Sequence, residues 1–278
     1  MWTKANRCRY ERRGLRYPSD LSDGEWFLLK PLIPLARHGG RKRSADVREV
    51  VNGLLYVLET GCPWRHLPKD FPPKSTVHGY FALWSWDGTL DRIHDALYVA
   101  LREHEGREAS PTAAIIDSQS AKSTAKGGLA SIPVGFDAGK KTKGVKRHVL
   151  TDHQGLLLNV VVHPADIQDR DGAKYVLTQR LRRRFPFIEV IFADAGYQGP
   201  RVRDAAKKAG TWQVQIVKRS ETQKGFAVIA KRWIVERTLA WISRNRRLAR
   251  DFENLARTAT ALVRLAMIKL MLRRLAYT

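Results

Sequence analysis

The chain has 278 residues, 44% of them hydrophobic, so it can bury a full core and falls outside the disordered class. Its formal net charge is +23 at pH 7. Such a charge repels itself unless a polyanion balances it, so we expect nucleic acid as the partner. The two cysteines, Cys8 and Cys62, exclude a disulfide framework and are too few for a zinc module.

Residues 1–20 form a basic arm, which we interpret either as a solvated tail or as an extension that contacts phosphate groups. The arm lacks the apolar run of a signal peptide. At the other end, residues 260–275 are the most apolar stretch, but four cations interrupt them. This pattern predicts an amphipathic helix that does not span a membrane.

Residues 21–108 are predicted to form a small helical domain, because apolar residues recur at helical spacing between capping and stop residues. The third helix is basic and aromatic, and it follows a loop far longer than the usual turn. The domain resembles a helix-turn-helix DNA-binding domain; a helical cap on the main domain is the alternative. The helices are expected at about 22–29, 44–58, 75–86 and 90–105, with a basic linker, Arg41, Lys42 and Arg43, after the first.

From residue 109 to residue 278 the pattern changes to strands that alternate with helices. The order is three strands, a helix, a strand, a helix, a strand and then helices. This order predicts an α/β domain of the ribonuclease-H-like fold, with a mixed five-stranded sheet and flanking helices. In that fold the first and fourth strands are parallel neighbours. The strands are expected at 113–118, 145–152, 156–163, 188–194 and 213–218, and the helices at about 170–184, 200–209, around Glu236 and 260–275.

Three acids lie where this fold could bring them together. Asp117 ends the apolar run of the first predicted strand and Asp194 that of the fourth, so each lies where a buried strand emerges, the usual place for functional groups in open α/β sheets. Glu236 lies on a helix rich in cations, one turn after Arg232. On a lone helix, Glu236 would simply pair with Arg232 or Arg237 on a solvated face. With two further acids at the strand ends, the helix could instead bring Glu236 over Asp117 and Asp194.

Converging carboxylates repel one another, and divalent cations remove that repulsion. Mg²⁺ prefers oxygen ligands and keeps several waters. Two such ions about 3.5–4 Å apart can activate an attacking oxygen and stabilise a leaving oxygen at phosphorus. No other catalytic motif competes, since the chain has no phosphate loop, no His-Glu-x-x-His helix and no Gly-x-Ser-x-Gly elbow. The eight histidines make no zinc signature.

A long polar insertion, residues 119–144, separates the first two predicted strands. A loop of this length is usually either functional or disordered. We interpret it as a loop that contacts phosphate groups; a merely floppy loop is the alternative. Its lysines and the start of the next strand would form a basic rim beside Asp117, made of Lys140, Lys141, Lys143, Lys146, Arg147 and His148.

Several short motifs follow one another between Tyr17 and Glu253, each weak alone and specific in combination. They are Tyr17-Pro18-Ser19-Asp20-Leu21, Gly61-Cys62-Pro63-Trp64-Arg65, Asp70-Phe71-Pro72-Pro73, Ile116-Asp117-Ser118-Gln119-Ser120, Gly144-Val145-Lys146-Arg147-His148, His163-Pro164-Ala165, Gln168-Asp169-Arg170-Asp171-Gly172-Ala173, Ala193-Asp194-Ala195-Gly196-Tyr197 and Asn245-Arg246-Arg247-Leu248. With them the chain resembles bacterial insertion-sequence transposases of the DDE class, in the family named "insertion sequence five".

The resemblance implies that Asp117, Asp194 and Glu236 are the catalytic residues and the ligands of two Mg²⁺ ions, for which Mn²⁺ can substitute. It also implies that Arg232, in the Arg-x-x-x-Glu part of the signature, holds DNA or orients Glu236.

The chain departs from the wider signature of related transposases, which has a tyrosine seven residues before the glutamate and a lysine seven after it. Ile229 and Ser243 stand at those places. We expect Arg244 or Arg247 to make the phosphate contact of that lysine. The residues expected to contact DNA are Arg41, Lys42, Arg43, Lys140, Lys141, Lys143, Lys146, Arg147, His148, Arg232, Arg237, Arg244 and Arg247.

Three further acids match positions of the family. We expect Asp137 to have a role within the insertion loop, and Asp169 and Asp171 to cap a helix.

The predicted function is that of a DNA transposase. It would bind the terminal inverted repeats of its insertion sequence, cut the DNA strands at the ends and transfer the 3′-hydroxyl ends to target DNA. Because two ends join one target, a dimer or larger homo-oligomer on double-stranded DNA is expected, in the bacterial cytoplasm with the nucleoid. The alternatives are a catalytically silent DNA-binding regulator and a nuclease of the same fold without strand transfer.

Overall fold

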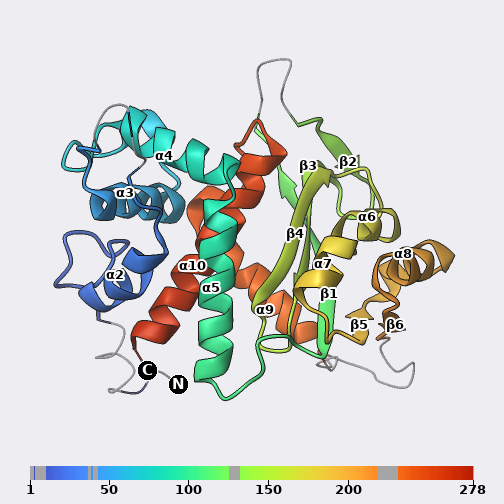
Figure 1. The fold of residues 1–278 in the computed structure, drawn as a ribbon. Coiled ribbons are helices and arrows are strands. Elements are labelled where there is room, and N and C mark those ends of the chain that lie inside the picture. Colours follow the sequence, from blue (N-terminus) through green and yellow to red (C-terminus); the bar gives the residue numbers. More distant parts are fainter. Residues whose placement is uncertain are drawn as a thin grey trace. The chain divides into compact units, whose positions relative to one another are not determined.

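The computed structural model describes residues 3, 11–36, 39, 43–124, 132–217 and 231–277. The chain divides into two compact units (Figure 1). The first comprises residues 1–107, 245–248 and 264–278, and the second comprises residues 108–244 and 249–263. Two segments of the predicted 109–278 domain therefore group with the helical unit.

The first unit consists of helices, two of which, α2 and α3, begin at residues whose side chains cap them. α2 (Asp23–Leu29) begins at Ser22, whose hydroxyl accepts from the Glu25 N–H while the Glu25 carboxylate accepts from the Ser22 N–H. α3 (Val47–Thr60) begins at Asp46 and ends at Gly61, whose φ of 70° is left-handed. The remaining helices are η1 (Lys30–Leu32), η2 (Trp64–His66), α4 (Lys74–Trp86), α5 (Thr89–His104), η4 (Arg246–Leu248) and the C-terminal part of α10 (Ala256–Ala276).

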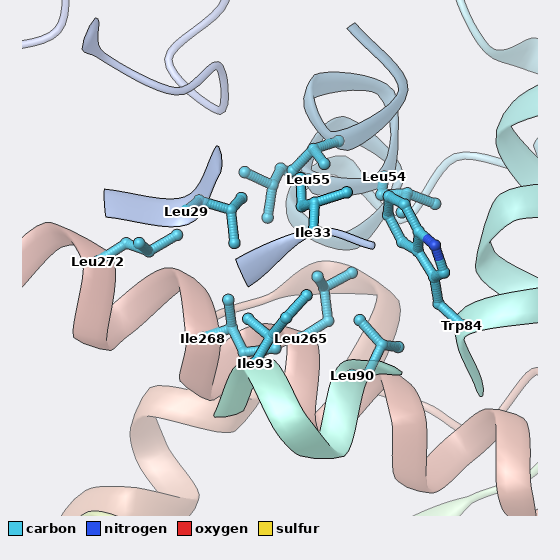
Figure 2. A pocket seen from close by; sticks show the side chains of 11 residues that line it. Leu29, Ile33, Leu54, Leu55, Trp84, Leu90, Ile93, Leu265, Ile268 and Leu272 are labelled. Carbon is cyan, nitrogen blue, oxygen red and sulfur yellow. The ribbon is translucent and has the colours of Figure 1, made fainter. Parts of the chain in front are cut away.

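Apolar side chains of these helices form the core of the first unit. Figure 2 shows Leu54 of α3, Ile93 of α5 and Ile268 of α10 around a cavity of about 10 Å³. The eleven side chains that line the cavity are aliphatic, apart from Trp84. A cavity that holds a single water at most, without polar partners, is a packing gap in the core and offers no ligand site.

α10 is the predicted C-terminal helix, and it contains the four cations that interrupt its apolar residues. One of them, Lys269, is buried in the first unit and donates to Glu59. In the part of the chain that the structure describes, no helix is apolar over a sufficient length to cross a membrane.

The second unit contains a six-stranded mixed sheet. The central strand β1 (Ala113–Lys122) pairs antiparallel with β3 (Thr142–Thr151) and parallel with β5 (Val190–Ala193). The first and fourth predicted strands are therefore parallel neighbours, as the ribonuclease-H-like order requires, which confirms the predicted fold class. At the edges, β3 also pairs antiparallel with β4 (Leu157–Pro164) and β2 (Gly135–Asp137), and β5 pairs parallel with β6 (Gln213–Ile216).

Helices pack against the sheet of the second unit (Figure 1). α6 (Asp169–Val176) contacts β3 and β4, α8 (Pro200–Gly210) contacts β6, and α9 (Arg232–Ser243) contacts β1 and β3.

Side chains alternate along β3, so its two faces meet different partners. Lys146 meets Asp169 of α6 on one face, whereas Val145 packs against Ala259 at the start of α10 on the other. β3 is thus covered on both faces, which explains why every residue from 144 to 151 is buried.

Two parts of this unit differ from the sequence prediction. β1 and β3 extend into the predicted insertion loop 119–144, of which residues 125–131 lie outside the described part, and β2 adds a short strand within it. Over the described residues the sheet therefore has six strands where five were predicted. The helix predicted at 170–184 is two helices, α6 and α7 (Gln179–Arg184). The break occurs because Leu177 is extended and the Thr178 hydroxyl caps a new helix.

Candidate active site

Asp117 and Asp194 emerge side by side from two parallel strands. β1 and β5 pair with Ile115 opposite Phe192, so both acids lie two residues beyond the last pair of these two strands. Asp194 directly follows the end of β5, whereas Asp117 lies within β1, which continues along β3 to Lys122. Both line one hollow, together with Val217 and with Arg232 and Val235 of α9. The pairing of strands predicted from element order thus brings these two predicted site residues together.

Short turns hold the two carboxylates in place. Asp117 Oδ1 accepts a hydrogen bond from the Ser118 backbone N–H at 2.7 Å. Asp194 Oδ1 accepts one from the Gly196 N–H at 2.9 Å and so caps the short helix η3 (Ala195–Tyr197). A Cβ at position 196 would lie 3.0 Å from that same oxygen, so glycine leaves the carboxylate the room it needs.

The pKa of Asp117 is raised to about 6. Burial is the main cause, and the nearby charge of Asp194 adds to it. The Ser118 N–H, Lys140 and Arg232 oppose the rise because each favours the charged carboxylate. The two acids therefore interact electrostatically in a partly buried hollow, with two cations close by.

Glu236 lies on α9 but outside this carboxylate pair. Its Oε1 is 3.4 Å from a guanidinium nitrogen of Arg232, one turn earlier, and its side chain is 55% exposed. The sequence allowed two arrangements, an ion pair on the helix surface or Glu236 over the other two acids, and each is partly present. The helical ion pair forms, and Arg232, which also lines the hollow, connects Glu236 to Asp117 and Asp194.

Two of the three predicted metal ligands, Asp117 and Asp194, line the hollow, and their carboxylate oxygens are the donors that a divalent cation such as Mg²⁺ prefers. The charge of Asp194 disfavours ionisation of Asp117, and a cation between the two carboxylates would remove that cost. Among the described residues, no group of three or more His, Cys, Asp and Glu side chains could hold a metal ion. Glu236 would complete the set only by leaving Arg232.

The predicted basic rim is divided between the surface and the interior. Lys140, Lys141 and Lys143 are exposed, and the Lys140 ammonium donates to the Ser118 carbonyl at 3.1 Å. In contrast, Lys146, Arg147 and His148 are buried, with exposed fractions of 5%, 1% and 0%. They lie on β3, which is covered on both faces, so they present no surface to a DNA backbone in this structure.

The other cations predicted to contact DNA also differ in exposure. Arg237 is half-buried: its guanidinium lies over the rings of Trp233 and Trp241, at 4.6 and 4.7 Å from their centroids, and donates to the Gln154 carbonyl. Arg244 is exposed.

In the helical unit, Arg247 is buried, with its guanidinium 5.9 Å from the Trp64 ring. Arg43 donates to the Pro34 carbonyl. Arg41 and Lys42 lie outside the described residues.

Three acids of the family motifs acquire defined partners. Asp137 has the predicted loop role, since it accepts from the Lys140 N–H and the Ser120 hydroxyl. Asp171 pairs with Arg201 on the surface. Asp169 does not cap a helix as predicted: its carboxylate accepts from the Ser118 hydroxyl and lies 2.9 Å from the Lys146 ammonium. Sequence reasoning missed this role because the partners come from two strands distant in sequence.

Known protein families match most of the chain. The family described as "Transposase DDE domain" matches residues 108–271, more than half of the chain, and the family described as "Putative transposase of IS4/5 family" matches residues 21–94. No solved structure gives a significant match.

Two relatives come from Burkholderia cepacia. The "Putative transposase for insertion sequence element IS402" is 34% identical over 119 residues, which are 41% of this chain and only 56% of that protein. The "Insertion element IS402 uncharacterized 16.2 kDa protein" is 31% identical over 113 residues, which are 38% of this chain and 76% of the relative. The chain, with two acids side by side on neighbouring parallel strands and a DDE-domain match over more than half of its length, belongs to the DDE transposases of insertion sequences.

Proposed function

We propose that this transposase binds the inverted repeats at the ends of its insertion sequence, cuts the strands there and joins the freed 3′-hydroxyls to target DNA. In cutting, water adds to phosphorus and the bond from phosphorus to the 3′ oxygen breaks. In joining, that 3′ oxygen bonds to a target phosphorus and displaces the target's own 3′ oxygen. The proposal is supported above all by the parallel pairing of β1 and β5, beyond whose last pair Asp117 and Asp194 line one hollow with Arg232.

The site residues would share this chemistry as follows. Asp117 and Asp194 would hold two Mg²⁺ ions, or Mn²⁺ in their place, and Glu236 would join them on release from Arg232. When bound, such ions help to deprotonate the attacking oxygen and stabilise the charge of the leaving one. Arg232, once released, would bind a phosphate oxygen at the rim of the hollow, and Lys140 would offset the charge of Asp117.

Strand cleavage tests the assignment of the three acids. Asp117→Ala, Asp194→Ala and Glu236→Ala should each lower Mg²⁺-dependent nicking of an inverted-repeat duplex by about two to three orders of magnitude. Binding of the same duplex should be largely unchanged. The matched control is Asp204→Ala, which removes an exposed acid of α8. If the triple variant still nicked its ends, the assignment would be wrong.

The same assay separates the alternatives. A wild-type protein that binds the repeats and never nicks them would be a regulator. One that nicks without joining the 3′ ends to a target duplex would be a nuclease.

We propose that residues 21–108 form the domain that binds the inverted repeats, with α4 as the element that meets DNA. The exposed side of α4 carries Lys74, Ser75 and His78. No atom lies within 4 Å of a Cβ built at Gly79 on the same side, so this face is open. A double variant, Lys74→Ala with His78→Ala, should weaken binding of the repeat duplex in a mobility-shift assay. Unchanged binding would exclude α4.

Joining two ends to one target requires more than one active site, so we propose a dimer or larger assembly on DNA. Light scattering of the protein with end DNA should give at least two protomers per pair of ends. A single protomer that joins both ends would contradict this proposal.

A further inference from the structure

A half-buried carboxylate, Asp169, lies beside the Asp117–Asp194 pair and contacts two strands. Its Oδ1 accepts a hydrogen bond from the Ser118 hydroxyl of β1 at 2.7 Å. The same oxygen lies 2.9 Å from the Lys146 ammonium of β3. Asp169 itself stands at the first position of α6, so one side chain ties the helix to both strands.

Ser118 connects Asp169 to the first acid of the site. Ser118 follows Asp117 directly, and its backbone N–H donates to Asp117 Oδ1 at 2.7 Å. The side chain of Ser118 is therefore held by Asp169 while its backbone holds Asp117. Any movement of Asp169 would shift the hydrogen-bond donor on which the Asp117 carboxylate depends.

The turn after β5 connects Asp169 to the second acid. A Cβ at Gly196 would lie 3.0 Å from Asp194 Oδ1 and 3.3 Å from Asp169 Oδ2. The Cα of Gly196 thus faces both carboxylates, and its N–H donates to Asp194 at 2.9 Å. Asp169 therefore limits where this turn, and with it Asp194, can lie.

The network is anchored by a buried ion cluster. The Lys146 side chain is only 6% exposed, and its ammonium lies 3.4 Å from Asp137 as well as close to Asp169. Asp137 is held in turn by the Ser120 hydroxyl and the Lys140 N–H. Removing one partner of a buried ion pair leaves an uncompensated charge, so such a cluster holds its members to one arrangement.

We propose that Asp169 is a positioning residue that sets the spacing of Asp117 and Asp194, through Ser118 on one side and the Gly196 turn on the other. The inference rests on the proposed function, because it concerns the site assigned there. Asp169 acts through its neighbours and does not touch the reacting atoms. A role as a helix cap alone does not account for its contacts, since its Oδ1 faces β1 and β3.

Mn²⁺ binding to the full-length protein without DNA, followed by electron paramagnetic resonance, tests the proposal independently of turnover. Asp169→Asn keeps the size of the side chain and removes its charge. Ser118→Ala removes one hydroxyl and leaves every ion pair in place, so it tests the same path if Asp169→Asn fails to fold. Both variants should weaken Mn²⁺ binding by about 10–100-fold, as is typical when partners of metal ligands are lost.

The half-saturating Mg²⁺ concentration for nicking should rise in parallel, while the Kd for end DNA stays within about twofold. The matched control is Asp171→Asn, which lies on the same helix and pairs with Arg201 at the surface; it should behave as wild type. A wild-type protein that neither binds Mn²⁺ nor nicks would overturn the proposed function. A wild type that does both, with Ser118→Ala and a folded Asp169→Asn indistinguishable from it, would overturn the role of Asp169 alone.

Discussion

At Gly172, α6 lies very close to the sheet. A Cβ at this position would collide with His148 Nε2 and lie 2.9 Å from His163 Nε2. Both imidazoles are buried, with ring centroids 4.7 Å apart. Burial lowers the pKa of His148 to about 3, and the neighbouring His163 contributes to the shift. Burial also lowers the pKa of His163, so both rings are neutral near pH 7 and can pack against each other without repulsion, with no space for a methyl group beside them.

Gly172→Ala should therefore destabilise the protein even though it improves helix propensity. Alanine gains about 1 kcal/mol over glycine in a helix interior, whereas overpacking a buried site costs about 1–3 kcal/mol. We expect a net loss of up to about 2 kcal/mol in the free energy of unfolding, measured by urea denaturation. Gly79→Ala is the matched control: it is also helical but faces open space, and should gain about 0.5–1 kcal/mol. A more stable Gly172→Ala would show that α6 can move away from the imidazoles.

α10 contains a buried cation, Lys269, in the part of the helix that belongs to the helical unit. Lys269 Nζ lies 2.5 Å from Glu59 Oε2 and 3.3 Å from Asn245 Oδ1. Burial lowers the pKa of Lys269 to about 8, assisted by Arg273 and opposed by Glu59.

The pKa of Glu59 is also lowered, because Lys269 and Arg273 together outweigh the effect of its burial. Both pKa values are lowered, but with opposite effects on charge: the shift favours the neutral form of Lys269 and the charged form of Glu59. Exposure explains this: the Glu59 side chain is 34% exposed and keeps part of its hydration, whereas that of Lys269 is 10% exposed.

Because of the lowered pKa of Lys269, the free energy of unfolding should depend on pH in the alkaline range. Between about pH 8 and 10.5, Lys269 is protonated in the unfolded chain and largely neutral in the folded one. The unfolded state then binds more protons, so the contribution of Lys269 to the free energy of unfolding rises with pH. Relative to Lys269→Met, the wild type should gain on the order of 2–3 kcal/mol from pH 7.5 to 10.5 in urea unfolding. A difference that stays flat or falls would mean that the Lys269–Glu59 ion pair outweighs burial.

Across the whole molecule, local patterns were predictable from the sequence. Asp117 and Asp194 each end an apolar run, and the order of strands and helices implied that their strands are parallel neighbours. Their meeting in one hollow followed from those two facts. The position of Glu236 was predictable only as far as its helix, because the choice between Arg232 and the other acids depends on side-chain packing.

The parts that could not be predicted depend on partners distant in sequence. Residues 119–122 are mostly polar and look like loop, yet they extend β1 because β3 supplies a complementary edge. Lys146 and His148 look like exposed residues of a basic strand. Their burial appears only when α6 covers β3 and supplies Asp169 as a partner. A single sequence does not reveal that a helix will pack over a strand and bury its cations.

Salt dependence of DNA binding distinguishes the surface cations from the buried ones. A protein of net charge +23 should bind end DNA with an affinity that falls steeply with salt, because each phosphate contact releases counterions. Each lost contact reduces the slope of log K against log salt by about 0.9. Lys143 is exposed at the start of β3, and Lys146, three residues later, is enclosed by Asp137 and Asp169.

We therefore expect Lys143→Gln to reduce the slope by about one and Lys146→Gln to leave it unchanged, in a fluorescence titration without divalent ions. Circular dichroism would confirm that both variants are folded. Equal losses of slope would mean that the ion cluster around Lys146 opens when DNA binds. The sequence-based expectation of a phosphate contact at Lys146 would then hold for the complex, since a cation counts toward the slope only if it reaches the DNA backbone.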